Sequence, residues 1–350
     1  MPNYRIAAVC LSIASMAGAQ TLMTLPDASQ QAGVSQRLGV TEITITYHRP
    51  LVGGRKIWGG LVPYGQVWRA GANENTTIQF SDAVTVEGKP LAAGTYGLHM
   101  MPGPDSCEVI FSKNSTSWGS FTYDKTEDAL RVTVKPRPAE FHEALTYDFD
   151  EVKPESAVAT LRWEKLAIPF TIAVDLKDTT LRSLRRELRG GKQYDWVSYD
   201  EAATFCLQKN TNLEEALHWS DLSIQNEERF ENLMTKSRLL EALNRAGDAK
   251  TVHDHAMEIG NATQIYFLGR QYQSQKKDTE AMETFHVVTK RFSNHWVSHL
   301  AQARIDSAAG HFDDAAKNLQ AALALGVPDQ SKSAVEGYLK RVQAKEDFNR

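Results

Sequence analysis

Hydrophobic and polar residues alternate along the first half of the chain. In Thr41–Tyr47 the side chains of Ile43, Ile45 and Tyr47 fall on one face of an extended segment, and the threonines fall on the other. No segment up to Leu176 has a useful helical period. Turn residues separate the alternating runs, which predict strands at 41–47, 76–80, 84–86, 94–101, 108–111, 130–135, 144–149, 158–163 and 168–174. The expected fold is an all-β antiparallel sandwich or a flattened barrel.

The pattern changes from about Leu181 onward, where Ala, Leu, Glu and Lys dominate and proline almost disappears until Pro328. Aligned segments place Ala216, Val252, Ala281 and Ala315 at equivalent positions, 36, 29 and 34 residues apart. This spacing resembles the tetratricopeptide repeat, a pair of antiparallel helices with a period of 34 residues. The best match is the third unit, with Leu268-Gly269, Tyr272, Ala281 and Phe285. The second half is therefore predicted to be an all-α helical-hairpin array.

Two further helices are expected at the ends of this array. Asp178-Thr179 can cap a linking helix over Leu181–Arg189, which Gly190-Gly191 would end. This helix carries a cluster of four arginines, Arg182, Arg185, Arg186 and Arg189. The cluster is expected to be a solvated face, with a partner site as the alternative. Residues Ser331 to Phe348 are expected to form a terminal helix that caps the stack.

The N-terminus has the features of an export signal. Arg5 precedes a short apolar run from Ile6 to Ala17, and Ala17-Gly18-Ala19 fits signal peptidase, with cleavage after Ala19. The run of about 12 residues is shorter than the ~20 needed to span a membrane, so a removed segment is favoured over an uncleaved anchor. The expected organisation is a signal peptide at 1–19, a β domain at 21–176 and a helical domain at 177–350. The expected location is periplasmic or secreted.

Composition excludes several classes of protein. Of 350 residues, 42% are hydrophobic and 23% charged, which is typical of a folded chain. The net charge is −4 and no long basic run occurs, so no nucleic-acid partner is expected. Apart from the N-terminus no sustained apolar run exists, so the protein is not expected to span a membrane. Cys107 and Cys206 fall in different predicted domains; buried free thiols are favoured, with a disulfide as the alternative.

Recognisable catalytic motifs do not occur in the sequence. There is no nucleotide-binding glycine motif, no zinc-protease motif and no serine-hydrolase elbow. His295 and His299 could share a helix face, but no acidic third ligand is obvious nearby. No metal and no cofactor are therefore expected, and a non-catalytic protein is favoured. The one pair considered for acid–base chemistry is His48 with His99.

The least generic stretch is residues 47–78, YHRPLVGGRKIWGGLVPYGQVWRAGANENTTI. Together with AAGTYGLHMMPG at 92–103, WGSFTYD at 118–124 and EDALRVTVKP at 127–136, it resembles the bacterial DUF2911 family over residues 25–175. The resemblance implies an exported β-sandwich domain, followed in some members by helical repeats of this kind. It implies no activity.

Cations, aromatic rings and amides in and near this loop are candidates for holding a sugar or a small anion. The candidates are Arg49, Arg55, Trp58, Tyr64, Trp68, Arg69, Asn73, Glu74 and His99. The structural alternative is that Arg49 or Arg69 pairs with Glu74 while Trp58 and Trp68 plug the end of the sandwich.

Two functions remain open at this point. The favoured one is an exported, non-catalytic binding or assembly protein, in which the helical repeats recognise a protein or peptide partner and the β domain is a second recognition module. The alternative is a periplasmic enzyme or binding protein for a carbohydrate or small anionic ligand that uses the loop at 47–78.

Overall fold

The computed structural model describes residues 26–349. The chain divides between Thr180 and Leu181 into two compact units, called here the β unit and the helical unit. The predicted signal peptide at 1–19 and its cleavage site lie outside the described residues. Within residues 26–349, no helix is both long enough and apolar enough to cross a membrane.

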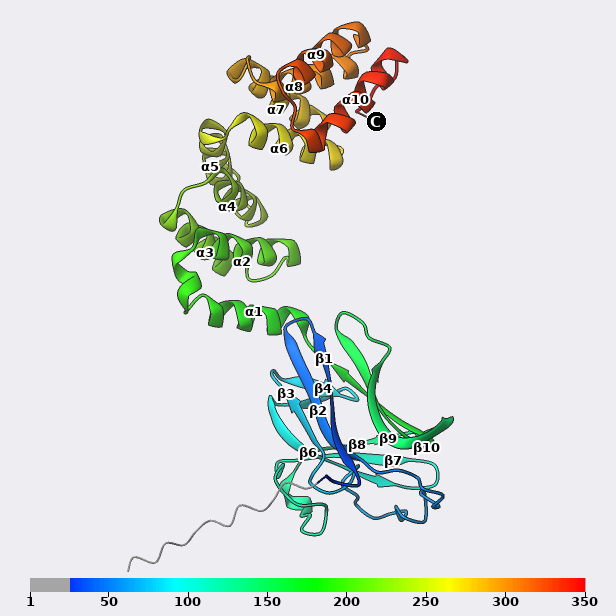
Figure 1. The fold of residues 1–350 in the computed structure, drawn as a ribbon. Helices are drawn as coiled ribbons and strands as arrows, with labels where there is room; N and C mark the ends of the chain where they lie inside the picture. Colours follow the sequence, from blue (N-terminus) through cyan, green and yellow to red (C-terminus); the bar gives the residue numbers. More distant parts are fainter. Residues whose placement is uncertain (1–25, 350) are drawn as a thin grey trace, which may run out of the picture. The chain divides into compact units, whose positions relative to one another are not determined.

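The β unit consists of two antiparallel sheets (Figure 1). The six-stranded sheet has the order β1-β2-β3-β6-β7-β8 and the four-stranded sheet has the order β5-β4-β10-β9. The strands are β1 Gln30–Leu38, β2 Thr41–Arg49, β3 Thr77–Phe80, β4 Val84–Val86, β5 Lys89–Leu91, β6 Gly94–Pro102, β7 Cys107–Ser112, β8 Asp128–Val134, β9 Arg137–Asp150 and β10 Ser156–Ala173. The predicted sandwich is confirmed. The sheets do not close on each other, so the flattened barrel is wrong.

Apolar side chains from both sheets share one core. Ile43, Ile45 and Tyr47 are buried, as the alternation of β2 predicts. Rings meet between the sheets: the Phe111 ring of β7 packs edge-on against Phe170 of β10 at 6.0 Å between centroids. Burial of this shared face is what holds the two sheets together.

The strand boundaries differ from the prediction in three places. The segments expected at 158–163 and 168–174 belong to one strand of 18 residues, β10, which passes through an irregularity at Glu164 with a left-handed φ of 54°. The strand expected at 144–149 is the last part of a longer strand, β9, which begins at Arg137 and in which Pro138 pairs with Leu166. Strand β1 is absent from the predicted strands, since only Leu38 of its polar sequence is buried.

Ten α-helices are found in residues 26–349. They are α1 Leu176–Glu187, α2 Trp196–Lys209, α3 Leu213–Asn226, α4 Phe230–Ala242, α5 Ala246–Ile259, α6 Ala262–Ser274, α7 Asp278–Arg291, α8 Trp296–Ala308, α9 Phe312–Ala324 and α10 Asp329–Gln343. Helices α2 to α9 form four consecutive hairpins, visible in Figure 1 from green through orange. The predicted tetratricopeptide-like array is confirmed.

Small residues at fixed positions let the two helices of each hairpin approach closely. The eighth residue of each first helix is small: Ala203, Ser237, Gly269 and Ala303. The fourth residue of each second helix is a buried alanine: Ala216, Ala249, Ala281 and Ala315, spaced by 33, 32 and 34 residues. The predicted register at Val252 is therefore wrong by three residues, and Val252 is only half-buried.

The helices at the ends of the array begin earlier than expected. Helix α1 begins at Leu176, and the carboxylate of Asp175, rather than Asp178, accepts a hydrogen bond from a first-turn amide at 3.0 Å. Helix α10 begins at Asp329 and ends at Gln343. The segment after it folds back, so that the Phe348 ring stacks on Tyr338 at 4.7 Å between centroids.

Candidate functional site

The tryptophans of the loop between β2 and β3 form a packed cluster rather than an open platform. Trp68 stacks on Trp163 of β10 at 5.8 Å, and Trp58 meets both rings edge-on at 6.0 and 6.2 Å. The indole N–H of Trp58 donates to the carbonyl of Trp163 at 3.3 Å, and that of Trp68 donates to the carbonyl of Gly71 at 3.1 Å. These two rings therefore fix the loop, whereas Tyr64 lies exposed beside Gly59.

Two arginines of the predicted site are used to hold the backbone. Arg49 donates to the carbonyl of Leu145 at 3.1 Å and to the hydroxyl of Thr146 at 2.9 Å. Arg55 donates to the carbonyls of Val52 and Leu51, within its own loop. Both guanidiniums therefore have a structural role in holding the loop.

Glu74 has a different partner from the ones expected. Its carboxylate lies 3.2 Å from Nε2 of His48, a buried side chain at the end of β2. The predicted pairing of Glu74 with Arg49 or Arg69 is therefore wrong. The neighbouring Asn73 has a left-handed φ of 55° and donates to the carbonyl of Ser29 at 3.2 Å. Asn73 thus ties the loop to the start of β1.

Unlike Arg49 and Arg55, the Arg69 guanidinium has neither a hydrogen bond nor an ion pair among residues 26–349. A bridge between Trp68 and Met100 places Arg69 opposite His99. The guanidinium lies over the ring of Trp118 at 5.8 Å, and its buried Nε has no hydrogen-bond partner. Burial lowers the pKa of Arg69, because no carboxylate compensates the desolvated charge.

His99 lies beside Arg69 and is 2% exposed. Its Nδ1 is 2.8 Å from the hydroxyl of Ser120, which comes from the loop between β7 and β8. Burial lowers the pKa of His99 to about 4, against an opposing effect of the Asp128 charge, so the imidazole is neutral at pH 7. The structure brings Arg69 and His99 together, whereas the side chains of His48, Arg49 and Arg55 are engaged with other partners.

A glycine makes room for the polar groups next to His99. A Cβ at Gly97 would come within 2.6 Å of Nδ2 of Asn75 and 3.2 Å of Nε2 of His99. Asn75 is buried; it donates to the carbonyl of Asn114 at 3.2 Å, and its Oδ1 has no partner. Such an orphaned acceptor is costly and calls for an explanation.

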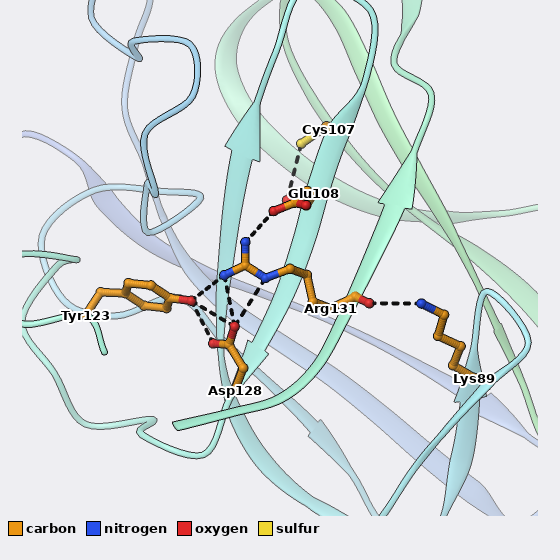
Figure 2. A network of polar contacts seen from close by, with 6 residues as sticks. All are labelled: Lys89, Cys107, Glu108, Tyr123, Asp128 and Arg131. Carbon is orange, nitrogen blue, oxygen red and sulfur yellow. Dashed lines mark hydrogen bonds and ion pairs between the residues drawn. The ribbon is translucent and has the colours of Figure 1, made fainter. Parts of the chain in front are cut away.

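A charged network adjoins this cluster (Figure 2). Arg131 of β8 pairs with Glu108 and with Asp128, and the hydroxyl of Tyr123 hydrogen-bonds to the Asp128 carboxylate at 2.8 Å. Burial, together with the Asp128 hydrogen bond and charge, raises the pKa of Tyr123 to about 12. The Tyr123 ring lies 5.5 Å from the His99 ring. The network therefore holds the loop of Ser120 against β6.

The sequence prediction missed Ser120 and two exposed aromatic residues beside it. Trp118 is 62% exposed and Phe121 is 79% exposed, and their rings stack on each other at 6.0 Å. All three lie in the string WGSFTYD, on which the family resemblance also rests. Two large exposed rings next to a serine, in a segment of that kind, were the available signal.

The helical unit has grooves between its hairpins. One groove, of about 410 Å³, lies along α4 and α6, with Asp200 of α2 at one end. Met234 and Phe267 supply apolar surface, and Phe267 is 59% exposed. A second groove of about 340 Å³ shares Met234, Arg238 and Gln271 with it, so the two form one continuous surface, called here the α4–α6 groove.

A further hollow of about 500 Å³ lies between α5 and α7 and adjoins the α4–α6 groove, with which it shares Glu241, His253, Tyr272 and Glu280. Its charged lining is mainly acidic, with Glu241, Asp254, Glu280 and Glu283 against Lys250, which pairs with Asp254 at 2.6 Å. Within the described residues no group of three potential metal ligands occurs. Cys107 and Cys206 are both buried and free, so the disulfide alternative is wrong.

Comparison with family models gives a match for the N-terminal half of the chain. Residues 29–172 match the family described as "Protein of unknown function (DUF2911)". The β unit matches the DUF2911 family. The resemblance of the 47–78 loop and its downstream strings is thereby confirmed, and the matched DUF2911 region includes Arg69, His99 and Ser120.

Two other comparisons add little. A search of curated proteins found no match. Among solved structures, the chain is similar to "Crystal structure of YrrB: a TPR protein with an unusual peptide-binding site", with 15% identity over 47% of this chain and 84% of that one. The TM-score of 0.27 is too low for anything to be transferred from that protein.

Proposed function

We propose that this is an exported, non-catalytic protein whose helical unit binds an extended segment of a partner protein in the α4–α6 groove. The observation that carries the proposal is the exposure of Phe267 in the wall of a groove that is lined by both apolar and polar side chains. A large ring left in water beside a concave surface is typical of a site that a partner covers.

The polar lining of the groove suits the backbone of an extended peptide. Such a peptide carries N–H donors and C=O acceptors that must be satisfied when they leave water. Oδ1 of Asp200 is buried without a partner, and the pKa of this carboxyl is raised by its burial, so it gains from an incoming N–H. Arg238 donates to Gln271 at 2.6 Å, and both side chains present further polar atoms to the groove.

The architecture of the array supports the same function. Stacked hairpins present the first helices of successive units along one continuous surface. The α4–α6 groove is built from α4 and α6, which are first helices of adjacent hairpins. A peptide lying along it would contact several repeats, which gives selectivity for sequence over a length that one pocket could not read.

Selection from a peptide library displayed on phage tests this proposal on the full chain. Enriched peptides are then measured by fluorescence polarisation against Phe267→Ala. We expect at least a tenfold loss of affinity for that variant, because an exposed aromatic anchor is removed. Leu325→Ala is the matched control, since Leu325 is exposed but lies outside the groove. No enriched peptide, or equal affinity for Phe267→Ala, contradicts the proposal.

Export is tested separately. We expect the protein expressed in a bacterial host to be recovered in the periplasm or medium with Gln20 as its first residue, as the Ala17-Gly18-Ala19 site predicts. N-terminal sequencing of the purified protein measures this. A mature chain that still begins at Met1 would contradict the predicted cleavage.

A further inference from the structure

We infer that the DUF2911 region holds a second binding site, distinct from the α4–α6 groove, in which Arg69 and Ser120 donate to the oxyanion of a small ligand and His99 orients the Ser120 hydroxyl. The site is formed where the loop between β2 and β3 meets the loop between β7 and β8. The ligand class is a small molecule that carries a carboxylate or a phosphate on a ring-shaped or flat body.

The charge of Arg69 is uncompensated. Among residues 26–349 no carboxylate forms an ion pair with it, although its Nε is buried and unpartnered. The nearest carboxylate candidate on the same loop, Glu74, is taken by His48. A partly buried guanidinium is costly unless an anion compensates it. A ligand oxyanion would supply both the missing charge and the missing acceptor.

The side chains next to Arg69 offer a second donor. Ser120 is half-buried, and its hydroxyl lies 2.8 Å from Nδ1 of the neutral His99. With the proton on Nδ1, His99 donates to Ser120, and the serine proton is free to donate to a ligand oxygen. A Cβ at Gly119 would lie 3.2 Å from a terminal nitrogen of Arg69. The guanidinium therefore lies against the residue that directly precedes Ser120. The Arg69 guanidinium and the Ser120 hydroxyl are therefore two donors for the same ligand oxyanion.

The side chains around Arg69 and Ser120 also suit the body of a ligand. Asn75 is more than nine-tenths buried, lies beside His99 against Gly97 and keeps an unpartnered Oδ1. An acceptor in this place can receive a hydroxyl or N–H of the ligand body. Trp118 and Phe121 expose two stacked rings on the same loop, next to the guanidinium. Flat apolar surface beside an oxyanion site suits a ring-bearing ligand.

The carboxylates of the neighbourhood do not oppose this assignment. Asp128 and Glu108 both form ion pairs with Arg131, and Lys89 donates to the carbonyl of Arg131, so the network holds two carboxylates and two cations. Their charge is thus held within the network drawn in Figure 2, while Arg69 lies outside it. The local charge available to a ligand is therefore positive.

Calorimetric titration of the full chain tests the inference, with glucuronate and inorganic phosphate as oxyanion probes and glucose as the neutral counterpart of glucuronate. We expect saturable binding of at least one oxyanion and at least tenfold weaker binding of glucose. A response to glucuronate alone identifies a carboxylate ligand, and a response to phosphate alone identifies a phosphate ligand. Absence of saturable binding by both anions overturns the inference.

Variants locate the binding. Arg69→Gln is expected to lower the affinity for the oxyanion at least tenfold. Arg37→Gln removes an exposed charge of the same unit and is expected to leave that affinity unchanged. Ser120→Ala tests the second donor if Arg69→Gln does not fold. Retention of wild-type affinity in a folded Arg69→Gln, or an equal loss in Arg37→Gln, overturns the assignment. The peptide groove of the helical unit is measured in the same preparations, so failure of one site does not imply failure of the other.

Discussion

The carboxylate of Glu74 pairs with the imidazole of His48, at 3.2 Å between Oε2 and Nε2, and not with the guanidinium of Arg69 five residues before it. His48 is the last residue but one of β2 and is buried, whereas the Glu74 side chain is 60% exposed. Sequence proximity therefore suggested a pair that the path of the loop separates. Arg69 is left facing His99 and Trp118.

This separation predicts that Arg69 and Glu74 act independently on stability. Glu74→Gln should change the free energy of unfolding by less than about 1 kcal/mol, because its side chain is largely exposed. The double variant with Arg69→Gln should be additive within about 0.5 kcal/mol. Urea denaturation of the two single variants and the double variant measures this. A coupling energy above 1 kcal/mol would show that the two side chains interact.

The repeat register predicts which alanine can be enlarged. Ala249→Leu and Ala281→Leu should each destabilise the helical unit by roughly 1–3 kcal/mol, since both side chains are buried where two helices meet. Val252→Leu is the matched control and should cost much less, because Val252 is half-buried. Thermal melting followed at 222 nm compares them. The reverse order, with Val252→Leu the more damaging, would restore the register that the sequence suggested.

The burial of His99 predicts how the stability of the protein depends on pH. Its pKa is about 4 in the folded protein, against an ordinary 6.5. Below pH 6.5 the unfolded chain binds a proton that the folded protein does not, so stability falls as the pH falls toward 4, by up to ~3 kcal/mol. His99→Gln removes this contribution. Urea midpoints of both proteins from pH 7.5 to 4 measure the difference, and parallel curves would contradict a buried neutral His99.

The contacts of Arg304 predict that the stability of the C-terminal end of the helical array depends on its guanidinium. Arg304 is buried; its Nε donates to the Tyr266 hydroxyl at 2.8 Å, and a terminal nitrogen donates to Asn349 Oδ1 at 3.0 Å. Arg304→Lys should cost roughly 1–3 kcal/mol, because one ammonium cannot reproduce this fork and leaves buried acceptors unpaired. The exposed Arg245→Lys is the control. Equal melting temperatures for the two variants would refute this role.

The change of hydrophobic period predicts that the two halves fold independently. Residues 21–176 expressed alone should give a β-type circular dichroism spectrum and a cooperative melt, and residues 177–350 alone a helical spectrum. The reason is that each half buries its own core. Aggregation of the 21–176 fragment under conditions where the full chain stays in solution would count against an independent β domain.

The sequence by itself determined the class of each half. Alternation with period two in β2 and the 34-residue recurrence of small residues follow from burial of one face, which is a local property of the chain. The same reasoning located Leu268-Gly269, Tyr272 and Phe285 in the third hairpin, where a Cβ at Gly269 would come within 2.5 Å of the Phe285 ring.

The tertiary structure decided which polar groups meet. Arg49 finds carbonyl and hydroxyl acceptors in β9, about a hundred residues away, while Arg69 finds no acid at all among the described residues. The pairing of His99 with Ser120 depends on how the loop after β7 folds back over β6. Contacts of this kind join loops from different strands, and no periodicity encodes them, because hydrogen bonds and ion pairs act over a few ångströms between residues that only the folded chain brings together.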